Sequence, residues 1–509
     1  MRAVRWGEAL SSIARRYAAQ IAVRDATSEI RFAQLFRKAA AVALRLMTAG
    51  VRPGEPVAVV VRNGIPAVWA SYGVALSGAA EVPINPGLSE ADCGHCLAVT
   101  KARRVVTDQD RAPIFRTTGI QVLSIEDFGE ADLDPAAFPP VAADAMARVV
   151  FTSGTTGLPK GAVHDQEGRW IANLLLKASL PHAPGRNTRL LLMTPFAHGA
   201  SLMTFAYLDR GATVTLLDGV DAERVLGMIG RGEVDEMFAP PTVLAKLVAA
   251  AECRLYERLK TIFCGTAPLT AALYTQTREI FGPVVRVTYG KSEVFNPITV
   301  LEAGETEAWY EEGGPDADAC VGWPASGVTI AVRNADGAPA RVGEEGEVLI
   351  WAQHLMRGYL RSEGYEPLPP DRFHDSGDLG YLDALGRLHL TGRIADVIKT
   401  GGYKVSPEEV ERPMSAAVAP SAVAAVGIPS KYWGEVIVLA VERPGPDWRD
   451  RVQEAAKRMT AYKRPKAFVT MDELPRTGIG KVRRSAIREH VLATYRLIDG
   501  PRPRLESRE

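Results

Sequence analysis

The chain has 509 residues, of which 47% are hydrophobic, and its 60 Lys and Arg residues balance 60 Asp and Glu residues. This balance excludes a strong overall field that would draw the protein to nucleic acid or to an anionic membrane. No apolar run approaches the roughly 18 residues of a membrane span, and the N-terminal sequence lacks the core of a signal peptide. We therefore expect a cytoplasmic protein of several domains that acts on small molecules, as a monomer or a homodimer, with no nucleic-acid or membrane partner.

The first 150 residues predict a regular alternation of strands and helices. Residues 57–61 form an unbroken apolar run, which is typical of a strand buried on both faces. Further strands are expected at 21–24, 30–32, 81–84, 102–107, 120–124 and 147–150, and helices at 33–49 and 67–77. This alternation indicates a parallel sheet with covering helices, so the sequence predicts the α/β fold class.

The five cysteines do not indicate a disulfide framework, because their number is odd and the chain is large. Cys93 and Cys96 have the Cys-x-x-Cys spacing of redox enzymes, but they lie inside a predicted helix that Ser89 would cap. A thioredoxin-type pair instead follows a strand and opens a helix. We therefore favour inert helix residues over a redox or metal site.

A loop rich in glycine and hydroxyl side chains follows the strand predicted at 147–150. Its candidate phosphate-binding residues are Thr152, Ser153, Gly154, Thr155, Thr156, Gly157 and Lys160. Glycines let backbone N–H groups approach a ligand closely, and successive N–H groups and hydroxyls form a concave anion site. The glycine spacing differs from that of a Walker A loop. Composition alone supports a polyphosphate site and an ordinary surface loop about equally.

Residues 162–320 continue the alternation, with strands expected at 190–193, 212–217, 236–238, 261–264 and 284–288. Several of these strands end in small or glycine-rich turns, such as 265–268 and 289–290. In an open α/β sheet, ligands bind beyond the carboxyl ends of the strands. We therefore expect these turns to be walls of one site.

From about residue 321 the sequence becomes β-rich, with strands expected at 328–332, 347–351 and 387–390. A different pattern begins at residue 392, with a helix from 407, strands at 422–427 and 436–441, and a basic helix near 485. The sequence therefore predicts a large domain over residues 1–391 and a small α+β domain over 392–509. We expect the polar tail at 500–509 to be frayed.

The loop at 151–161 resembles the signature phosphate loop of the acyl-adenylate-forming (ANL) superfamily. That superfamily includes acyl- and aryl-CoA ligases, peptide-synthetase adenylation domains and firefly luciferase. The resemblance is nearest to aryl- and acyl-CoA ligases such as the 4-chlorobenzoate–CoA ligases, and it covers nearly the whole chain. It implies a large multi-layer N-terminal α/β domain, with parallel sheets and a β-rich subdomain, and a small mobile C-terminal domain.

Residues 289–293, Tyr-Gly-Lys-Ser-Glu, resemble the family's Tyr-Gly-x-Thr-Glu motif. The resemblance implies that Tyr289 lies near the adenine and that Ser292 touches phosphate. It also implies that Glu293 is catalytic and holds Mg²⁺, which prefers a carboxylate together with phosphate oxygens. A lone glutamate is more often a solvated turn residue, and Lys291 has no expected role.

Other residues of the nucleotide site follow from the same resemblance. Asp378 resembles the family aspartate that accepts hydrogen bonds from both ribose hydroxyls, which suits the two oxygens of a carboxylate. Arg393 resembles the arginine that meets ribose or phosphate at the domain junction. Gly265 and Thr266 match the segment that lies against the adenine.

Residues 475–481, Pro-Arg-Thr-Gly-Ile-Gly-Lys, resemble the family's C-terminal catalytic motif Pro-x-Thr-x-x-Gly-Lys. The resemblance implies that Lys481 lies between the carboxylate and the α-phosphate during adenylation and leaves when the small domain rotates. A cation near an anion is worth about 1 kcal/mol in water but about 4 kcal/mol at an effective dielectric constant near 20. Taken alone, Lys481 would be the start of a solvated basic helix.

By motif register, the acyl pocket is expected to be lined by Leu175, His198, Gly199, Ala200, Cys264, Thr288, Phe295 and Asn296. These residues are mostly apolar or small, so they suit a compact uncharged acid. The set contains no arginine that would pair with a second carboxylate, which argues against a dicarboxylate. His198 would gate the pocket or orient the acid, although a core histidine is almost as well supported.

The segment 392–411 resembles the family hinge and the glycine loop of the second half-reaction, with Ala395 where the family has Asp or Lys. The candidate residues for the acceptor CoA are Gly401, Gly402, Trp433, Tyr462 and Arg464. Aromatic stacking and an arginine on phosphate suit the nucleotide end of CoA. Relatives that do not use CoA keep similar residues.

The sequence therefore predicts an ATP- and Mg²⁺-dependent acid–thiol ligase. It would convert a compact aryl, alicyclic or acyl carboxylate to acyl-AMP and pyrophosphate, and then transfer the acyl group to CoA. An amide synthetase that passes the same acyl-AMP to an amine or amino acid is the alternative. A non-catalytic nucleotide sensor is less well supported, because Glu293, Asp378 and Lys481 are all present.

Overall fold

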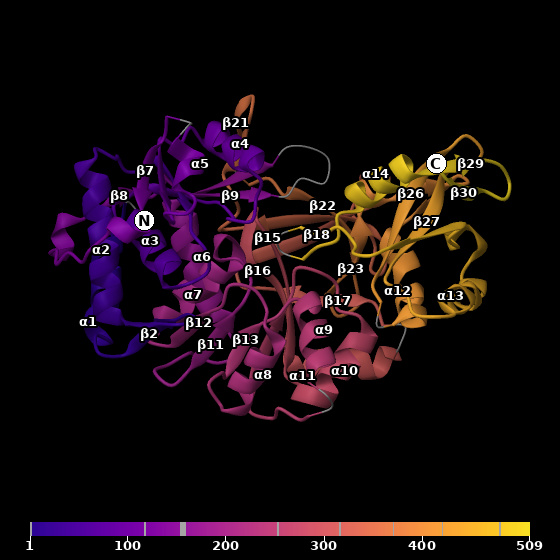
Figure 1. Cartoon of the computed structure of the whole chain (residues 1–509), viewed down its shortest axis with the longest axis horizontal. Helices are drawn as coiled ribbons and strands as arrows, with labels where there is room; N and C mark the ends of the chain where they lie inside the picture. The colour runs from indigo at the N-terminus through magenta and orange to yellow at the C-terminus, as the bar shows by residue number, and fades with distance from the viewer. Residues whose placement is uncertain are drawn as a thin grey trace.

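Two large sheets and a smaller one organise the chain, and the smaller sheet lies in a separate C-terminal lobe at one end of the molecule (Figure 1). The computed structural model describes residues 3–116, 119–152, 159–251, 254–314, 317–369, 371–419, 421–477 and 480–508, without the side chains of Asn296 and Lys404. None of the helices within these ranges has the length and apolarity needed to cross a bilayer.

The first large sheet is parallel at its centre. In spatial order its strands are β21 (Gly364–Pro367), β20 (Gly358–Arg361), β10 (Lys160–Asp165), β9 (Met146–Thr152), β5 (Ala80–Pro83), β4 (Pro56–Val60), β6 (Arg104–Thr107) and β7 (Gln121–Ser124). Strand β4 pairs in parallel with β5 and β6, and its last four residues are buried. The apolar run expected to be a fully buried strand is therefore confirmed.

The second large sheet changes from parallel to antiparallel along its length. In spatial order its strands are β18 (Val328–Arg333), β19 (Gly346–Ala352), β22 (His374–Leu382), β23 (Leu388–Arg393), β17 (Ala319–Pro324), β16 (Val294–Leu301), β15 (Val285–Lys291), β14 (Thr261–Cys264), β13 (Glu236–Phe238), β11 (Arg189–Leu192), β12 (Thr213–Leu216), β2 (Ile21–Arg24) and β3 (Glu29–Arg31). From β15 to β2 the pairs are parallel, and from β15 to β18 they are antiparallel. This antiparallel part is the expected β-rich subdomain.

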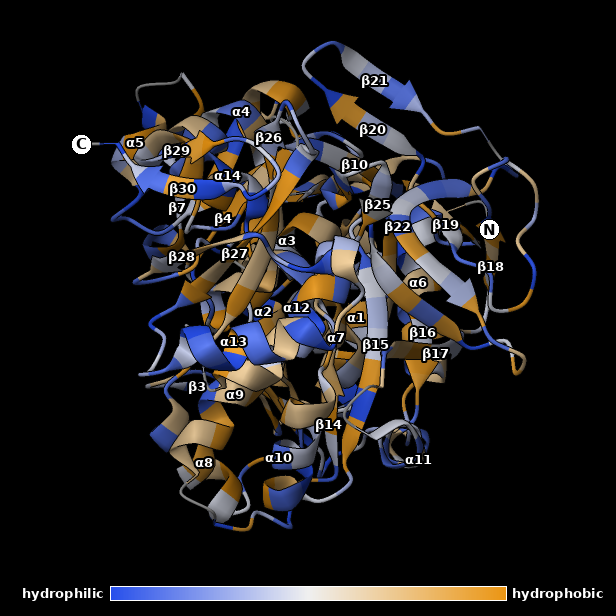
Figure 2. Ribbon diagram, turned by 90° about the vertical axis from the view of Figure 1, so that its right-hand side faces the viewer, coloured by the Kyte–Doolittle hydropathy of each residue, from blue (hydrophilic) through white to orange (hydrophobic). Residues whose placement is uncertain are grey.

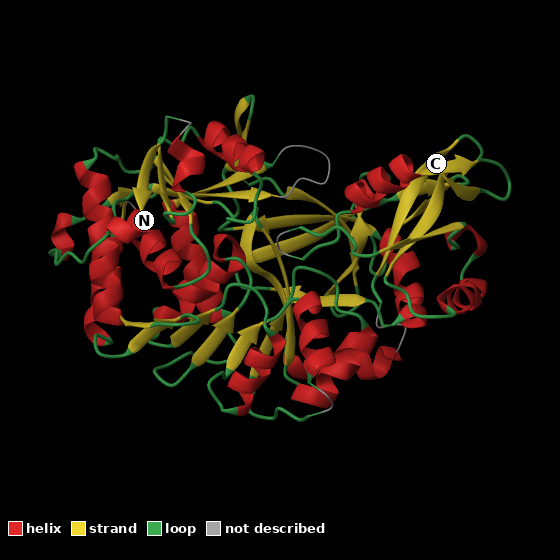
Figure 3. Cartoon of the chain, viewed as in Figure 1, coloured by secondary structure: helices red, strands yellow, loops and turns green. Residues whose placement is uncertain are grey.

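Helices lie between and around these two sheets (Figure 3). They are α1 (Trp6–Arg16), α2 (Phe32–Thr48), α3 (Ile65–Leu76), α4 (Glu90–Thr100), α5 (Ala112–Arg116), α6 (Gln166–Ala178), α7 (Ser201–Leu208), α8 (Ala222–Gly230), α9 (Pro241–Ala250), α10 (Ala271–Phe281) and α11 (Ala303–Gly313). One buried cluster joins Val57 of β4 to Leu190 of β11 through side chains of α3 and α7, such as Val68 and Leu208. These helices therefore form a layer between the sheets.

The Cys-x-x-Cys pair lies within α4, as expected. Ser89 caps this helix by accepting a hydrogen bond from Asp92 N. Cys93 and Cys96 are buried free thiols, and burial raises the pKa of Cys96 to about 12. A thiol with such a pKa is unreactive near neutral pH.

The C-terminal lobe has its own sheet and two apolar clusters. Its strands are β25 (Tyr403–Val405), β24 (Ile398–Thr400), β27 (Gly434–Glu442), β26 (Val423–Ser430) and β28 (Ala467–Met471), and its helices are α12 (Pro407–Val418), α13 (Trp448–Lys457) and α14 (Arg484–Thr494). Helices α12 and α13 pack on one face and α14 on the other. In Figure 2, α13 is largely hydrophilic whereas β27 is largely hydrophobic, as expected for a helix that covers a buried strand.

The prediction of a frayed tail was wrong. Strand β30 (Arg504–Ser507) pairs antiparallel with β29 (Tyr495–Ile498). Leu497 and Leu505 of this hairpin pack against the α14 side of the C-terminal lobe. This packing stabilises the tail, and the polar, proline-bearing sequence did not reveal it. One short pair remains, in which β1 (Ala3–Val4), near the N-terminus, pairs antiparallel with β8 (Val141–Ala142).

Candidate active site

The ends of strands β15 and β23 bring three side chains onto the carboxylate of Asp378, which lies in the middle of β22. Arg393 Nε lies 3.0 Å from Oδ1, Lys291 Nζ donates to Oδ2 at 2.9 Å, and the Tyr289 hydroxyl also donates to Oδ2. Burial alone would raise the pKa of Asp378, but Lys291 and then Arg393 outweigh it and lower the pKa. Asp378 is therefore a buried, charged acceptor.

Lys291 holds this arrangement from the third position of the Tyr-Gly-Lys-Ser-Glu motif. Besides its contact with Asp378, Lys291 Nζ donates to the main-chain oxygen of Ser376 at 2.8 Å. Ser376 Oγ in turn accepts a hydrogen bond from Asp378 N. Lys291 thus fixes both the side chain and the backbone around Asp378, a role that the sequence did not reveal.

Glu293 lies in the turn between β15 and β16 and is buried. The Tyr359 hydroxyl donates to its Oε1 at 2.8 Å, and Lys160 Nζ lies 3.8 Å from the centre of the Tyr359 ring. Burial alone would raise the pKa of Glu293, but Lys291 and the Tyr359 hydrogen bond outweigh it and lower the pKa. Tyr359 was not predicted, since it is 66 residues away in sequence and no motif contains it.

Glu293 could hold a magnesium ion only together with phosphate oxygens of a bound nucleotide. Within the described parts of the chain, there is no group of three or more His, Cys, Asp or Glu side chains that could hold a metal by themselves. Mg²⁺ commonly takes one or two carboxylates together with phosphate oxygens and water. One charged carboxylate at the strand ends is therefore a suitable donor for a nucleotide-bound Mg²⁺.

Lys481 reaches this cluster from the C-terminal lobe. A tight loop presents it: Thr477 N donates to Lys481 O at 2.7 Å, and Lys481 N donates to Thr477 Oγ1 at 3.1 Å. Gly480 has φ +83° in this loop, and a Cβ added there would lie 2.9 Å from Thr242 Oγ1 of α9. Burial, with Arg393 next in importance, lowers the pKa of Lys481 to about 8. The charges of Arg393 and Lys291 thus reach Lys481, although the two residues belong to the cluster around Asp378.

His198 lies in a kinked turn (Phe196–Ala200) that precedes α7, with φ −113° and ψ −141°. Ser201 Oγ donates to His198 O at 2.8 Å and accepts from Arg148 at 2.7 Å, which anchors the turn. Burial, and then Arg148 and Lys481, lower the pKa of His198 to about 4. The imidazole is thus neutral at physiological pH, and the charge of Lys481 contributes to that shift.

The other residues predicted to line the acyl pocket differ in burial, since some lie in the core and others are partly or fully exposed. Phe295 stacks on His164 with ring centres 3.8 Å apart, and Ala200 is buried while Gly199 is exposed. Leu175 approaches Gly327. Cys264 is wholly buried at the end of β14, and the side chain of Asn296 lies outside the described part.

The turn after β14 packs tightly against β15. A Cβ added at Gly265 would lie 2.6 Å from the main-chain oxygen of Thr288, so only glycine allows this approach. Thr266 has φ +72°, which is uncommon for a residue other than glycine. Such strained residues cluster at functional sites. The two residues predicted to lie against adenine therefore form a constrained turn at the expected strand end.

The predicted phosphate loop is only partly described. Strands β9 and β10 form an antiparallel pair in which Thr152 lies opposite Lys160. Ser153, Gly154, Thr155, Thr156 and Gly157 lie outside the described residues. Thr152 ends β9 and Lys160 begins β10. Ser292, in the turn after β15, contacts the His164 ring through its main-chain oxygen.

The structure brings some of the predicted acceptor residues together in the C-terminal lobe. Gly401 N donates to Trp433 O at 2.8 Å, and a Cβ at Gly401 would lie 3.2 Å from the indole ring. Lys466 Nζ, which was not predicted, lies 4.0 Å from the centre of the same ring. Gly402, with φ +84°, has open space around its Cα.

Two further acceptor candidates already have partners. Tyr462 stacks on Tyr403 with ring centres 4.1 Å apart. Arg464 donates from Nε to Met459 O and from Nη2 to Lys457 O, each at 2.9 Å, so its guanidinium closes the end of α13. A phosphate at Arg464 would have to use its remaining N–H groups.

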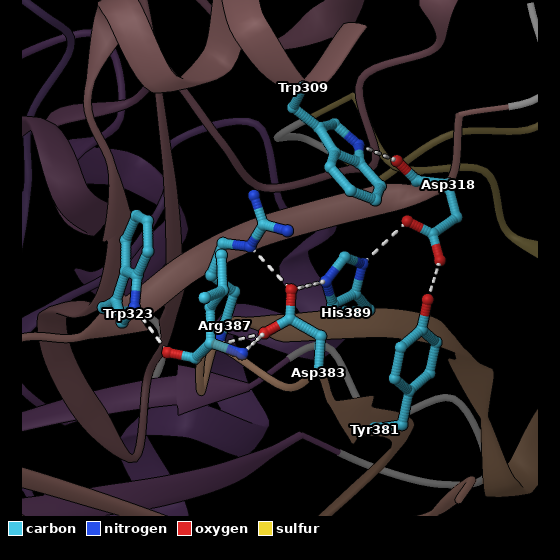
Figure 4. Close-up of polar contacts among 8 residues, drawn as sticks. Trp309, Asp318, Trp323, Tyr381, Asp383, Arg387 and His389 are labelled. Atoms are coloured by element: carbon cyan, nitrogen blue, oxygen red, sulfur yellow. Dashed lines mark hydrogen bonds and ion pairs between the residues drawn. The ribbon is translucent and has the colours of Figure 1, made fainter. Parts of the chain in front are cut away.

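A polar network supports the two strands that carry Asp378 and Arg393 (Figure 4). His389 of β23 lies between two carboxylates, with Nδ1 2.8 Å from Asp318 Oδ1 and Nε2 3.2 Å from Asp383 Oδ2. Burial alone would lower the pKa of His389, but the hydrogen bonds and charges of Asp318 and Cys320 together outweigh burial, and the pKa rises to about 10. The network thus holds a buried imidazolium on β23, the strand that ends at Arg393.

Comparison with known proteins places this site in a family. The model of the AMP-binding enzyme family matches residues 10–360, and the model of the AMP-binding enzyme C-terminal domain matches residues 409–481. The chain belongs to the AMP-binding enzyme family. The predicted acyl-adenylate-forming membership is thereby confirmed.

Relatives with curated names are similar over nearly the whole chain. A feruloyl-CoA synthase from an Amycolatopsis species is 28% identical over 479 residues, which cover 92% of this chain and 95% of that protein. The 4-chlorobenzoate–CoA ligase of Pseudomonas sp. (strain CBS-3) is 27% identical over 533 residues, which cover 98% and 96%. The predicted resemblance to that ligase is therefore confirmed.

Solved structures share the fold. The o-succinylbenzoate–CoA synthetase of Bacillus subtilis, in complex with ATP and magnesium, has a TM-score of 0.81 and 26% identity, and the match covers 94% of this chain and 98% of that chain. The amide bond synthetase McbA of Marinactinospora thermotolerans has a TM-score of 0.81 and 23% identity, with 95% and 99% covered. The predicted fold, a large α/β part with a small α+β lobe, is confirmed.

Proposed function

We propose that the protein is an ATP-dependent carboxylic acid ligase that forms an acyl-adenylate and transfers its acyl group to CoA. The observation that carries this proposal is the position of Lys481. It comes from the C-terminal lobe, yet the preceding Gly480 lies against Thr242 of α9, where an added Cβ would come within 2.9 Å of Oγ1, and Arg393 and Lys291 help to lower the pKa of Lys481. A lysine between the lobes and beside a strand-end anion site is suited to bring a carboxylate and a triphosphate together.

In the first step, a carboxylate oxygen of the acid attacks the α-phosphorus of ATP, and the bond to pyrophosphate breaks. Lys481 in its protonated form offsets the repulsion between the two anions, and its partial burial strengthens that effect. Asp378 accepts hydrogen bonds from the ribose, while Arg393 meets ribose or phosphate. Glu293 would hold Mg²⁺, which neutralises phosphate charge when bound.

The phosphates would lie in the loop between β9 and β10, near Lys160. The adenine would lie along Gly265 and Thr266 with Tyr289 beside it. The acid would enter between His198 and the residues around Thr288 and Phe295. Because His198 is neutral at physiological pH, it would orient the acid by hydrogen bonding and not by charge.

In the second step, the CoA thiol attacks the acyl carbon, the bond to AMP breaks, and the thiol proton passes to solvent. For this step we propose that residues 392–509 rotate as one domain against residues 1–391, about the hinge at Ala395. Lys481 would then leave the site, and the loop of Gly401 and Gly402 would replace it. Trp433, Tyr462 and Arg464 would lie toward the nucleotide end of CoA.

An amine acceptor in place of CoA is the second candidate. The likeness of fold to an amide bond synthetase supports it, and so do the existing partners of Arg464, which leave a weaker phosphate site than the sequence implied. We further propose that the enzyme works in the cytoplasm on small molecules, as a monomer or a homodimer. Its balanced charge is consistent with partners other than nucleic acids or membranes.

The test is product analysis with ATP, Mg²⁺ and a panel of aryl, alicyclic and medium-chain acids, run once with CoA and once with amino acids. We expect acyl-CoA in the first series, with AMP formed in equal amount. If acyl-amides form and acyl-CoA does not, the acceptor is an amine and not the CoA thiol. ATP binding without pyrophosphate release for any acid would make the protein a nucleotide sensor and overturn the proposal.

A further inference from the structure

The C-terminal hairpin of β29 and β30 lies against the loop that carries Trp433. Residues 431–433 form this loop and connect β26 to β27. Trp433 packs against the same apolar cluster of the C-terminal lobe as Leu497 and Leu505 of the hairpin, which lies at the outer end of the lobe (Figure 1). The match to the family's C-terminal model ends at residue 481, before the hairpin begins. The family model therefore assigns the hairpin no role.

Asp499, in the segment between β29 and β30, binds this loop through both oxygens of its carboxylate. Its Oδ1 accepts a hydrogen bond from Ser430 Oγ at 2.6 Å, and its Oδ2 accepts from the main-chain nitrogens of Lys431 and Tyr432 at 2.6 and 3.3 Å. Ser430 Oγ in turn accepts a hydrogen bond from Trp433 N at 2.9 Å. The hydrogen bond from Ser430 is the largest influence on the pKa of Asp499 and lowers it. A charged carboxylate of the hairpin therefore holds the backbone of the loop.

The hairpin also holds the indole ring of Trp433. The ring nitrogen Nε1 donates a hydrogen bond to Gly500 O at 3.0 Å. Lys466 Nζ lies 4.0 Å from the centre of the ring, and a Cβ added at Gly401 would lie 3.2 Å from the ring. The hairpin, a lysine and the glycine loop thus fix the orientation of the indole together.

The loop of Trp433 is joined directly to the glycine loop that we propose for the second half-reaction. Gly401 N donates to Trp433 O at 2.8 Å. Next to this contact, Thr400 pairs with Gly434 across strands β24 and β27. A shift of Trp433 would therefore move Gly401 as well. The contacts run from Asp499 through the loop at 430–433 to the glycine loop without a gap.

Building on the proposed ligase function, we propose that Asp499 is a positioning residue for the second half-reaction, because it holds Trp433 and the glycine loop in the place where the acceptor binds. A binding surface that is ordered before its ligand arrives loses less conformational freedom on binding. In the described part of the chain, the hydrogen-bond partners of Asp499 are Ser430, Lys431, Tyr432 and Gly500. None of these residues belongs to the proposed adenylation site, so Asp499 acts on the acceptor step alone.

The experiment uses the full-length Asp499→Asn variant, which keeps the size of the side chain but replaces one accepting oxygen by a donating NH2 group. Thiolysis is measured with CoA and the acyl-AMP of the acid that releases pyrophosphate fastest. We expect the KM for CoA to rise at least fivefold while kcat and pyrophosphate release stay within twofold of the wild type. In hydrogen exchange, the amides of residues 430–434 and 400–402 should exchange at least fivefold faster.

Ser430→Ala removes the other side of the same contact and should have the same effects. If the two residues act through each other, the double variant will be no worse than the worse single variant. Asp134→Asn is the matched control, because Asp134 is also exposed and accepts a main-chain hydrogen bond, from Ala136 N at 2.8 Å, but lies in the large domain. It should match the wild type in every measurement.

An unchanged KM for CoA, or unchanged exchange at residues 400–402, would overturn the inference. An equal loss of pyrophosphate release and thiolysis would also overturn it, since the hairpin would then serve only general stability. If the wild type does not use CoA but exchange is faster in Asp499→Asn, the CoA acceptor is refuted and the link between the hairpin and the glycine loop stands.

Discussion

Lys291 Nζ lies 2.9 Å from Asp378 Oδ2 and joins the end of β15 to strand β22. The same nitrogen binds the main chain at Ser376. Because both lysine and aspartate are nearly buried, each charge compensates the other where water is scarce. The position after Tyr289-Gly290 therefore sets the geometry of the proposed ribose site, although it touches no expected ligand group itself.

Replacing Lys291 by methionine should weaken nucleotide binding. Hydrogen bonds to charged groups contribute about 1.5–3 kcal/mol, so we expect the Kd for ATP to rise by at least tenfold, measured by calorimetry. The pKa of Asp378 should rise as well, which makes the loss greater at low pH. Lys260→Met is the control, because that lysine is exposed and lies 3.8 Å from its partner Asp235. Equal ATP affinity in Lys291→Met and wild type would contradict this role.

Adenylation should lose rate as the pH rises through about 8. The pKa of Lys481 is lowered to about 8 in this conformation, so its charged form is present below that pH and is lost above it. We expect kcat/KM for pyrophosphate release to fall with an apparent pKa near 8. Lys481→Ala should abolish this step and leave the thiolysis of supplied acyl-AMP nearly intact. Equal loss of both steps would argue against a role confined to adenylation.

Gly480→Ala should impair the first half-reaction selectively. A Cβ at this position would meet Thr242 Oγ1 at 2.9 Å, and its φ of +83° is unfavourable for alanine. We expect pyrophosphate release to fall at least tenfold, with little change in thiolysis of supplied acyl-AMP. Gly343→Ala carries a similar φ of +77° in open space and tests backbone strain alone. If both variants behave alike, the contact with Thr242 is not what matters.

The His389 network should make stability fall with rising pH. An ordinary histidine has a pKa of about 6.5, and that of His389 is raised to about 10. A group whose pKa is raised on folding contributes stability that is complete below the unfolded pKa and is lost as pH rises through the folded one. We therefore expect the Tm to decrease between about pH 6.5 and 10. His389→Gln should have a lower Tm at pH 7 and a flatter profile.

His490→Gln is a control for this measurement, because His490 is exposed on α14. It should follow the wild-type profile of Tm against pH. Identical slopes in wild type and His389→Gln would mean that the two carboxylates around His389 do not hold a proton there.

The sequence by itself determined the elements and their order. Apolar runs such as 57–61 became buried strands, and Ser89 became the cap it was predicted to be. The turn predicted at 265–268 follows the end of β14, whereas residues 289–290, also predicted as a turn, lie within β15. These features depend on local periodicity and backbone preference, which are readable along the chain. The family motifs likewise located Glu293, Asp378, Arg393 and Lys481, because each motif carries its own spacing.

Only the tertiary structure decided which side chains meet across long separations. Tyr359 on Glu293, Lys291 on Asp378, and Asp499 on Ser430 depend on the pairing and stacking of distant strands and helices. The hairpin at the C-terminus was missed for the same reason, since its stability comes from packing on the lobe and not from its own composition. Burial then set the pKa values, because charge–charge interactions strengthen only after the fold has removed water from around them.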